Sequence, residues 1–242
     1  MISNWYDIHS HTLPGVDDGA VDFEMAEKML RLASSDGTRH IIMTPHYCSG
    51  KFECDTAFIQ SQFENLCHMT KQILPDMNLY LGQELYYSND LTDLLWDGKI
   101  KTLADSSYIL IEFSYERDYL FIQWALEELR SAGYKVILAH FERYSCLQNN
   151  IERLRELVDS GVYLQITAAY AREMTGKVFS NYIKKAFQEH LIHFVGTDSH
   201  NTTSRPPLMR KCISVLCKKY GMQYVREMLI SNPEKIIQNK FI

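Results

Sequence analysis

Apolar residues gather into short runs that alternate with longer segments of helical spacing. Seven runs rich in β-branched and aromatic residues have the length and composition of buried strands. They cover residues 5–8, 40–44, 79–81, 108–112, 135–139, 162–166 and 193–196. Because helical segments separate the runs, we expect parallel strands joined by crossover helices.

Five of the intervening segments place apolar residues three and four positions apart, as in an amphipathic helix. These predicted helices span residues 23–32, 58–74, 119–129, 151–158 and 179–187. Asp22 precedes the first of them as a candidate N-cap. The C-terminal portion, residues 206–239, is expected to be helical as well.

This alternation predicts an α/β fold in which seven parallel strands close into a barrel with the helices outside. An open, doubly wound sheet is the alternative. Polar residues at the carboxyl ends of several predicted strands favour the barrel, because barrels build their active sites there. The chain shows no internal repeat, low-complexity tract or Pro/Gly/Ser linker, so we expect residues 1–242 to form a single domain.

Charge and composition exclude several classes of protein. The 242 residues include 25 Lys and Arg against 30 Asp and Glu, and no basic block with interleaved aromatic residues, so we expect no nucleic-acid partner. No signal peptide or membrane span is evident, which predicts a cytoplasmic protein. The six cysteines form no C-x-x-C pair and are expected to be reduced; Cys48 could approach a metal near His46, but a small apolar loop residue is the preferred interpretation.

Histidine and acidic residues close the predicted strands one after another. His9 and His11 are two apart on a strand and therefore face the same side, which lets both imidazoles bind one metal ion. Asp17 and Asp18 follow in a segment that would also suit an ordinary turn. The other candidates are His46, Glu84, Glu112, His140, Asp198 and His200. Any one of them could be a capping or surface residue, but their recurrence at strand ends indicates a centre for several metal ions.

Two arginines follow candidate ligands in the same loops. Arg143 lies three residues after His140, and Arg205 lies five residues after His200. A guanidinium group there could bind phosphate oxygens in bidentate fashion. The alternative is a surface arginine that pairs with Glu142 or Glu173.

Several motifs together resemble one known family. They are Asp-Ile-His-Ser-His-x-Leu-Pro-Gly-Val-Asp-Asp-Gly, Thr-Pro-His, Gly-Gln-Glu, His-x-Glu-Arg-Tyr, and Asp-Ser-His-Asn followed by Pro-Pro. The set, which spans residues 7–209, resembles the polymerase-and-histidinol-phosphatase (PHP) family. It is most similar to the bacterial capsule and exopolysaccharide branch, whose members are manganese-dependent protein-tyrosine phosphatases.

This resemblance implies a distorted seven-stranded (β/α)7 TIM-like barrel, the PHP fold, with three divalent metal ions. Manganese is the expected metal, with iron or zinc as alternatives. The implied ligands are His9, His11, Glu84 and Asp198 for the first ion; Glu84 as a bridge, Glu112 and His140 for the second; and His46, His200 and Asp18, with Asp17 in reserve, for the third.

The resemblance also assigns phosphate binding to Arg143 and Arg205. This chain departs from the branch at Phe141, where proline is usual, so the loop that carries Arg143 is expected to be less constrained.

The predicted function is hydrolysis of phosphotyrosine on a protein. The resemblance implies a substrate in the tail of a bacterial tyrosine kinase that controls capsular or exopolysaccharide synthesis. No Cys-x5-Arg loop or Gly-x-Ser-x-Gly elbow is present, so a phosphatase built on this chain would use metal-activated water rather than a side-chain nucleophile.

Three alternatives stay open. The first is a small-molecule phosphatase of the histidinol-phosphatase type, which would need the same ions. The second is a metal-bound, non-catalytic regulator that docks on a kinase. The third is an amidohydrolase, a class that shares His-x-His but lacks strand-end glutamates such as Glu84 and Glu112.

Overall fold

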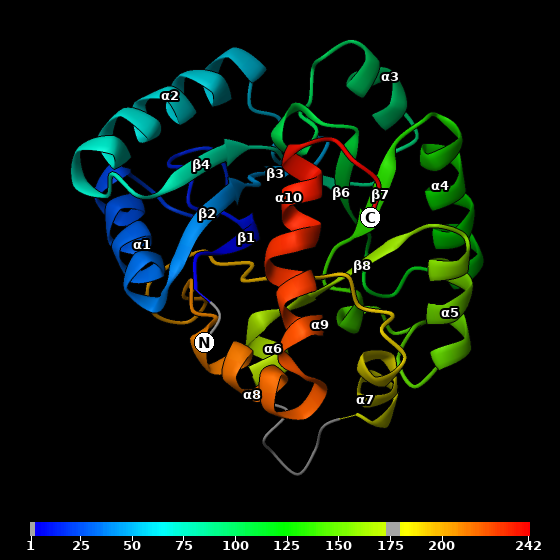
Figure 1. The fold of residues 1–242 in the computed structure, drawn as a ribbon. Coiled ribbons are helices and arrows are strands. Elements are labelled where there is room, and N and C mark those ends of the chain that lie inside the picture. The colour runs from blue at the N-terminus through cyan, green and yellow to red at the C-terminus, as the bar shows by residue number, and fades with distance from the viewer. Residues whose placement is uncertain (1–2, 173–179) are drawn as a thin grey trace.

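The computed structural model describes residues 3–172 and 180–242, whose strands form two parallel sheets (Figure 1). One sheet has the order β1-β2-β4 and the other the order β3-β5-β6-β7-β8-β9. The strands are β1 (Trp5–Ser10), β2 (Thr38–Met43), β3 (His46–Tyr47), β4 (Asn78–Leu81), β5 (Glu84–Tyr86), β6 (Tyr108–Glu112), β7 (Lys135–Leu138), β8 (Tyr163–Thr167) and β9 (Phe194–Gly196). All their ladders are parallel, as predicted.

The two sheets meet where β1 lies beside β9. The Asp198 backbone N–H donates to the carbonyl oxygen of His9 at 2.8 Å, and the His11 N–H donates to that of Ser199 at 2.9 Å. The parallel sheet is therefore curled, and the predicted α/β class is confirmed.

The seven predicted strand runs correspond to seven of these strands, whereas β3 and β5 were not predicted. They begin shortly after β2 and β4 end, and the N–H of Glu84 in β5 donates to the carbonyl oxygen of Pro45 at 3.2 Å. Proline at 45 has no N–H to continue a ladder, so the chain is interrupted as a strand between the end of β2 and the start of β3. Unlike β9, these two short strands begin with a polar residue and form no apolar run of their own in the sequence.

Helices cover the outside of the curled sheet (Figure 1). Asp22 caps α1 as expected, since its carboxylate accepts the Met25 N–H at 2.8 Å. The predicted helix 179–187 corresponds to α7, although Phe179 lies outside the described residues. The helices are α1 (Phe23–Asp36), α2 (Thr56–Ile73), α3 (Leu91–Trp96), α4 (Tyr119–Ser131), α5 (Ile151–Asp159), α6 (Ala168–Arg172), α7 (Asn181–Gln188), α8 (Arg210–Tyr220), α9 (Met222–Arg226) and α10 (Asn232–Ile237), with a π-helical turn over Glu227–Ser231 and 3-10 turns over Leu103–Asp105 and Phe141–Arg143.

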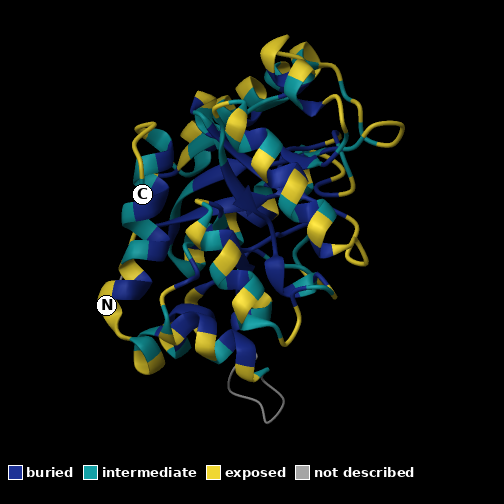
Figure 2. Cartoon of the chain, turned by 90° about the vertical axis from the view of Figure 1, so that its right-hand side faces the viewer, coloured by how far each residue is buried: buried dark blue, intermediate teal, exposed yellow. Residues whose placement is uncertain are grey.

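The strands form the most deeply buried part of the molecule, whereas the helices are exposed along their outer faces (Figure 2). Side chains from several strands, including Ile8, Leu110 and Ile137, pack together inside the curl with Ile236 of α10. Asn239, just after α10, accepts the N–H of Ser107 at 3.0 Å, immediately before β6 begins. The C-terminal segment therefore covers the amino ends of the strands.

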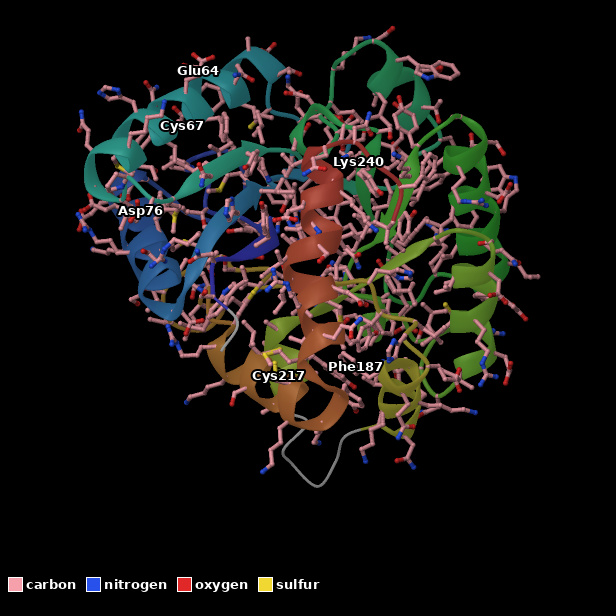
Figure 3. All side chains as sticks on the ribbon, viewed as in Figure 1. Glu64, Cys67, Asp76, Phe187, Cys217 and Lys240 are labelled. Atoms are coloured by element: carbon pink, nitrogen blue, oxygen red, sulfur yellow. The ribbon has the colours of Figure 1, made fainter. Side chains whose placement is uncertain are left out.

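All six cysteines are free in the structure. Figure 3 shows two of them well separated, Cys67 on α2 and Cys217 on α8. Among the described residues, the helices are too short or too polar to cross a bilayer.

Candidate metal centre

Four buried side chains from distant parts of the chain converge at the carboxyl end of β1. The Nε2 atoms of His9 and His11 lie 3.2 Å apart. Oδ1 of Asp198 lies 3.5 Å and 3.4 Å from these two nitrogens. Oε2 of Glu84 lies 3.1 Å and 3.3 Å from them. A divalent ion with bonds of about 2.1 Å holds neighbouring ligand atoms about 3.0–3.4 Å apart, so this group could hold one ion.

Glu84 also belongs to a second group of donors. Its Oε1 atom lies 2.8 Å from Nε2 of His140, and its Oε2 atom lies 3.1 Å from Nδ1 of His46. Glu112 faces the same two rings, with Oε1 3.2 Å from His46 and Oε2 3.5 Å from His140. One carboxylate thus lies between two donor groups, the arrangement of a bridging ligand.

A third group surrounds Asp18. Its Oδ1 atom lies 3.6 Å from Nε2 of His46 and 3.5 Å from Nε2 of His200, and His11 completes the group. His46 therefore faces two groups, one with each ring nitrogen. The resemblance placed His46 with the ion at Asp18, and the structure brings all nine predicted ligands together.

Asp17, held in reserve as a ligand, has a different position. Its Oδ2 atom accepts from Nδ1 of His11 at 2.7 Å and from the His46 N–H at 2.9 Å. The turn is tight, because a Cβ atom added at Gly19 would lie 2.0 Å from the carbonyl oxygen of His11. Asp17 thus orients His11, and Asp18 faces the other donors.

Two unpaired atoms test whether the residues fit a metal. Oε2 of Glu84 and Nε2 of His200 are buried with no hydrogen-bond partner. Buried polar atoms nearly always have a hydrogen-bond partner, so each of these two atoms suits a cation bound between it and the neighbouring ligand atoms of its own group. A mixed imidazole and carboxylate donor set fits manganese, iron or zinc.

The charges of the centre agree with this fit. Burial favours the neutral form of Glu84, yet the adjoining imidazoles, His9 first among them, hold the pKa of its carboxyl well below the ordinary value. Burial and the positive charges of His11 and Arg205 lower the pKa of His200 to about 3. At neutral pH the metal-free centre therefore holds an ionised Glu84 and a neutral His200 ring. The neighbouring carboxylates raise the pKa values of His11 and His140, so a bound cation would displace protons from these two rings.

The loop after β7 presents His140 and Arg143 together. His140 has a left-handed backbone with φ of 33°, which is uncommon outside glycine and marks a constrained site. Phe141, where the resemblance leads us to expect proline, is fully buried in the core. Glu142 accepts hydrogen bonds from the backbone and hydroxyl of Thr167 at 3.0 Å and 2.7 Å. Packing and these bonds anchor the loop in place of the ring of a proline.

Both predicted arginines point at the centre. The guanidinium groups of Arg143 and Arg205 pair with Oδ2 of Asp198, whereas Oδ1 of Asp198 faces His9 and His11. Neither pairs with Glu142, and Glu173 lies outside the described residues. Nη1 of Arg143 donates a hydrogen bond to the hydroxyl oxygen of Tyr115 at 3.1 Å.

A pocket of about 420 Å³ opens onto these groups. Aromatic residues and a lysine that the sequence did not single out complete its wall. Cys48 lines the pocket too, but it is absent from the three donor groups found among the described residues. The lining residues are Asp18, His46, Cys48, Lys51, Phe52, Glu84, Tyr86, Glu112, Tyr115, His140, Arg143, Asp198 and Arg205.

Sequence reasoning missed Tyr115 and Gln165, whose partners Arg143 and His9 lie far away in the chain, and also Phe52, whose ring stacks on that of His46. No local motif marks them.

Comparison with known proteins places the chain in a family. A family model described as capsular polysaccharide synthesis, CpsB/CapC, matches residues 5–238. The chain belongs to the CpsB/CapC family. This membership confirms the resemblance drawn from the motifs.

Two CpsB/CapC relatives match over nearly their whole length. The tyrosine-protein phosphatase CpsB of Streptococcus pneumoniae is 36% identical, over 98% of this chain and 99% of that protein. The tyrosine-protein phosphatase YwqE of Bacillus subtilis is 31% identical, over 98% and 92%. A crystal structure from a study of YwqE and CpsB, described as unique metal-dependent tyrosine phosphatases, superimposes with a TM-score of 0.89 at 30% identity, covering 98% of this chain and 96% of that one.

Proposed function

We propose that the protein is a metal-dependent protein-tyrosine phosphatase. The observation that carries the proposal is the position of Glu84, whose carboxylate lies between two groups of histidine and acidic donors beside two arginines. The named activities of the S. pneumoniae and B. subtilis relatives support it.

In this proposal the centre holds three divalent ions, manganese first, with iron or zinc as alternatives. His9, His11, Glu84 and Asp198 would hold the first; Glu84, Glu112 and His140 the second; Asp18, His46 and His200 the third. Bound ions of this kind supply a nucleophilic water at neutral pH and neutralise phosphoryl charge.

Arg143 and Arg205 bind the phosphate oxygens of the substrate. Their guanidinium groups already lie beside Asp198, and both line the pocket, so their remaining N–H groups are available to an incoming anion. The hydroxyl of Tyr115 accepts a hydrogen bond from Arg143, which limits the entropy lost when phosphate binds.

The pocket wall favours an aromatic phosphate ester. Phe52, Tyr86 and Tyr115 all line it, and aromatic side chains pack well against a phenyl ring. This lining supports phosphotyrosine over small aliphatic esters such as histidinol phosphate.

The wider assignment rests on the resemblance of the motifs and on the family description, capsular polysaccharide synthesis. We propose as substrate the tyrosine-rich tail of a bacterial tyrosine kinase that acts in capsular or exopolysaccharide synthesis, in the cytoplasm, where free cysteines persist. Residues 1–242 would form one catalytic domain, a distorted seven-stranded barrel in which β2 with β3, and β4 with β5, each count as one interrupted strand.

Phosphate release tests the proposal. With added Mn²⁺, the protein should release phosphate from a phosphotyrosine peptide at least about tenfold more efficiently than from histidinol phosphate or a phosphoserine peptide of the same sequence. Preference for histidinol phosphate would favour the small-molecule alternative, and binding of a kinase without phosphate release would favour the regulator.

A further inference from the structure

Gln165 of β8 is a fully buried amide that contacts two of the segments carrying proposed ligands. Its Oε1 atom lies 3.1 Å from Nδ1 of His9 and accepts the backbone N–H of His140 at 2.9 Å. Its Nε2 atom donates to the carbonyl oxygen of Ile166 at 2.7 Å. One side chain therefore joins β1, β8 and the loop after β7.

The backbone partners fix which way this amide points. An N–H can only donate and a carbonyl oxygen can only accept, so His140 and Ile166 together place the oxygen of Gln165 toward His9. The Nδ1 atom of His9 must then carry a proton and donate it to that oxygen. Its Nε2 atom, which faces Glu84 and Asp198, is then the ring nitrogen left to bind a metal ion.

Close packing holds this arrangement in place. Gly196 of β9 lies against both side chains, and a Cβ atom there would come within 2.6 Å of Cβ of His9 and 3.1 Å of Nε2 of Gln165. The His9 ring and the amide therefore have little room to turn.

We propose that Gln165 is a positioning residue that sets the tautomer of His9 and ties it to the backbone of His140. The inference rests on the ligand assignment of the proposed function. It predicts that loss of Gln165 lowers the affinity for the ions held by His9 and by His140. The affinity for the ion at Asp18 should be unaffected, because Gln165 makes no hydrogen bond to Asp18, His46 or His200 in the described structure.

Gln83 offers a matched control. It is also buried, with 2% of its surface exposed, and its Oε1 atom accepts the Lys101 N–H at 2.7 Å. This hydrogen-bond partner is a backbone group rather than a proposed ligand, although Gln83 adjoins Glu84 in sequence. Gln83→Met and Gln165→Met therefore each remove a buried amide and leave at least one backbone N–H without its acceptor.

The experiment measures metal affinity directly. Full-length wild type, Gln165→Met and Gln83→Met are stripped of metal, checked for melting temperature, and titrated with Mn²⁺ by calorimetry. We expect affinity to fall about 10- to 100-fold at two of the sites in Gln165→Met, the usual range for losing a hydrogen-bond partner of a ligand. Gln83→Met should bind Mn²⁺ like wild type.

Three outcomes are decisive. Equal Mn²⁺ affinities in the two variants would overturn the role of Gln165 and leave the proposed function standing. A wild type that binds no divalent metal would contradict the ligand assignment, and this inference with it. Wild type loaded with Zn²⁺ supplies a test that needs no variant, because ¹⁵N-histidine NMR should show His9 protonated at Nδ1; protonation at Nε2 would overturn the proposal.

Discussion

Glu84 illustrates how much the centre depends on single atoms. One carboxylate faces four imidazole rings, at 2.8–3.3 Å, and its ionised form is favoured by them. Glu84→Gln keeps the shape but removes the charge and one oxygen donor. We expect kcat toward a phosphotyrosine peptide to fall more than about a hundredfold, with loss of bound metal measured by mass spectrometry.

Glu128→Gln is the matched control, since Glu128 accepts the hydroxyl of Tyr87 at 2.6 Å and is absent from the donor groups. It should keep both activity and metal. A Glu84→Gln protein with full metal content and more than about a tenth of wild-type turnover would contradict the bridging role.

Arg143 and Arg205 are the next single residues on which the proposed activity depends. Replacing either with Ala removes a charge-assisted contact to phosphate worth roughly 1.5–3 kcal/mol, so kcat/KM should fall about ten- to a hundredfold with metal content unchanged. Lysine should restore part of the loss, because its point charge cannot form a bidentate fork.

Arg153→Ala provides the comparison, because Arg153 is also partly buried but bonds to the carbonyl oxygen of Cys146 at 2.6 Å. Its kcat/KM should match wild type. Normal efficiency in both Arg143→Ala and Arg205→Ala, or loss that merely follows unfolding, would contradict phosphate binding by these residues.

At the residue scale, the histidines and acidic residues at strand ends were predictable as metal ligands because the residue type alone determines which side chains can donate to a metal ion. The residue types alone did not separate Asp17 from Asp18, since both are carboxylates in one turn; the preference for Asp18 came from the resemblance. Only the neighbours decide: Asp17 meets Nδ1 of His11, and Asp18 meets His46 and His200.

The elements that carry the site are short loops stiffened by side chains. In the loop after β9, Oδ1 of Asn201 accepts the backbone N–H groups of Thr203, Ser204 and Arg205 at 3.0, 2.8 and 3.1 Å. The N–H groups of His200 and Asn201 in turn donate to the carbonyl oxygen of Arg205. This closed turn fixes the backbone position of Arg205 and with it the direction in which its side chain extends.

Asn201→Ala should therefore weaken substrate binding without touching the metal ligands. We expect KM for a phosphotyrosine peptide to rise about 5- to 30-fold, equivalent to about 1–2 kcal/mol of lost ordering, with kcat and bound metal nearly unchanged. Asn201→Asp keeps an oxygen acceptor in the turn and should restore most of the affinity. Equal KM values for wild type and Asn201→Ala would show that the turn does not position Arg205.

The secondary-structure elements also show where prediction from hydrophobic periodicity fails. Longer elements such as β6 and α4 follow from periodicity and were predicted within a few residues, whereas the short helices α3 and α6 were not predicted. β3 and β5 are too short for any period, yet they carry His46 and Glu84. Their pairing depends on hydrogen bonds to strands distant in the sequence.

For the whole molecule, the curled sheet brings carboxylates from four distant segments to one buried place. Glu84 and Asp198 are almost fully buried and their pKa values lie well below ordinary, so their negative charges persist at neutral pH. Such charges are costly to bury unless cations compensate them. Stability and activity should therefore depend on the same ions.

Chelation tests this dependence. Removal of metal should abolish phosphate release, and Mn²⁺ at about 100 times its dissociation constant should stabilise the fold by about 2.7 kcal/mol per ion. For a chain of this length that corresponds to a rise in melting temperature of about 5–10 °C per ion. Calorimetry and phosphate release on one sample measure both quantities.

The control separates metal chemistry from thiol chemistry. Cys48 lines the pocket, so a bulky alkylating reagent could block the substrate without removing a nucleophile, and the test is made on Cys48→Ser. This variant should keep wild-type turnover before and after alkylation, because burial raises the pKa of Cys48 and the thiol is not proposed to attack phosphorus. Loss of turnover in unalkylated Cys48→Ser, or full activity and an unchanged melting temperature after complete chelation, would each contradict a metal-dependent mechanism.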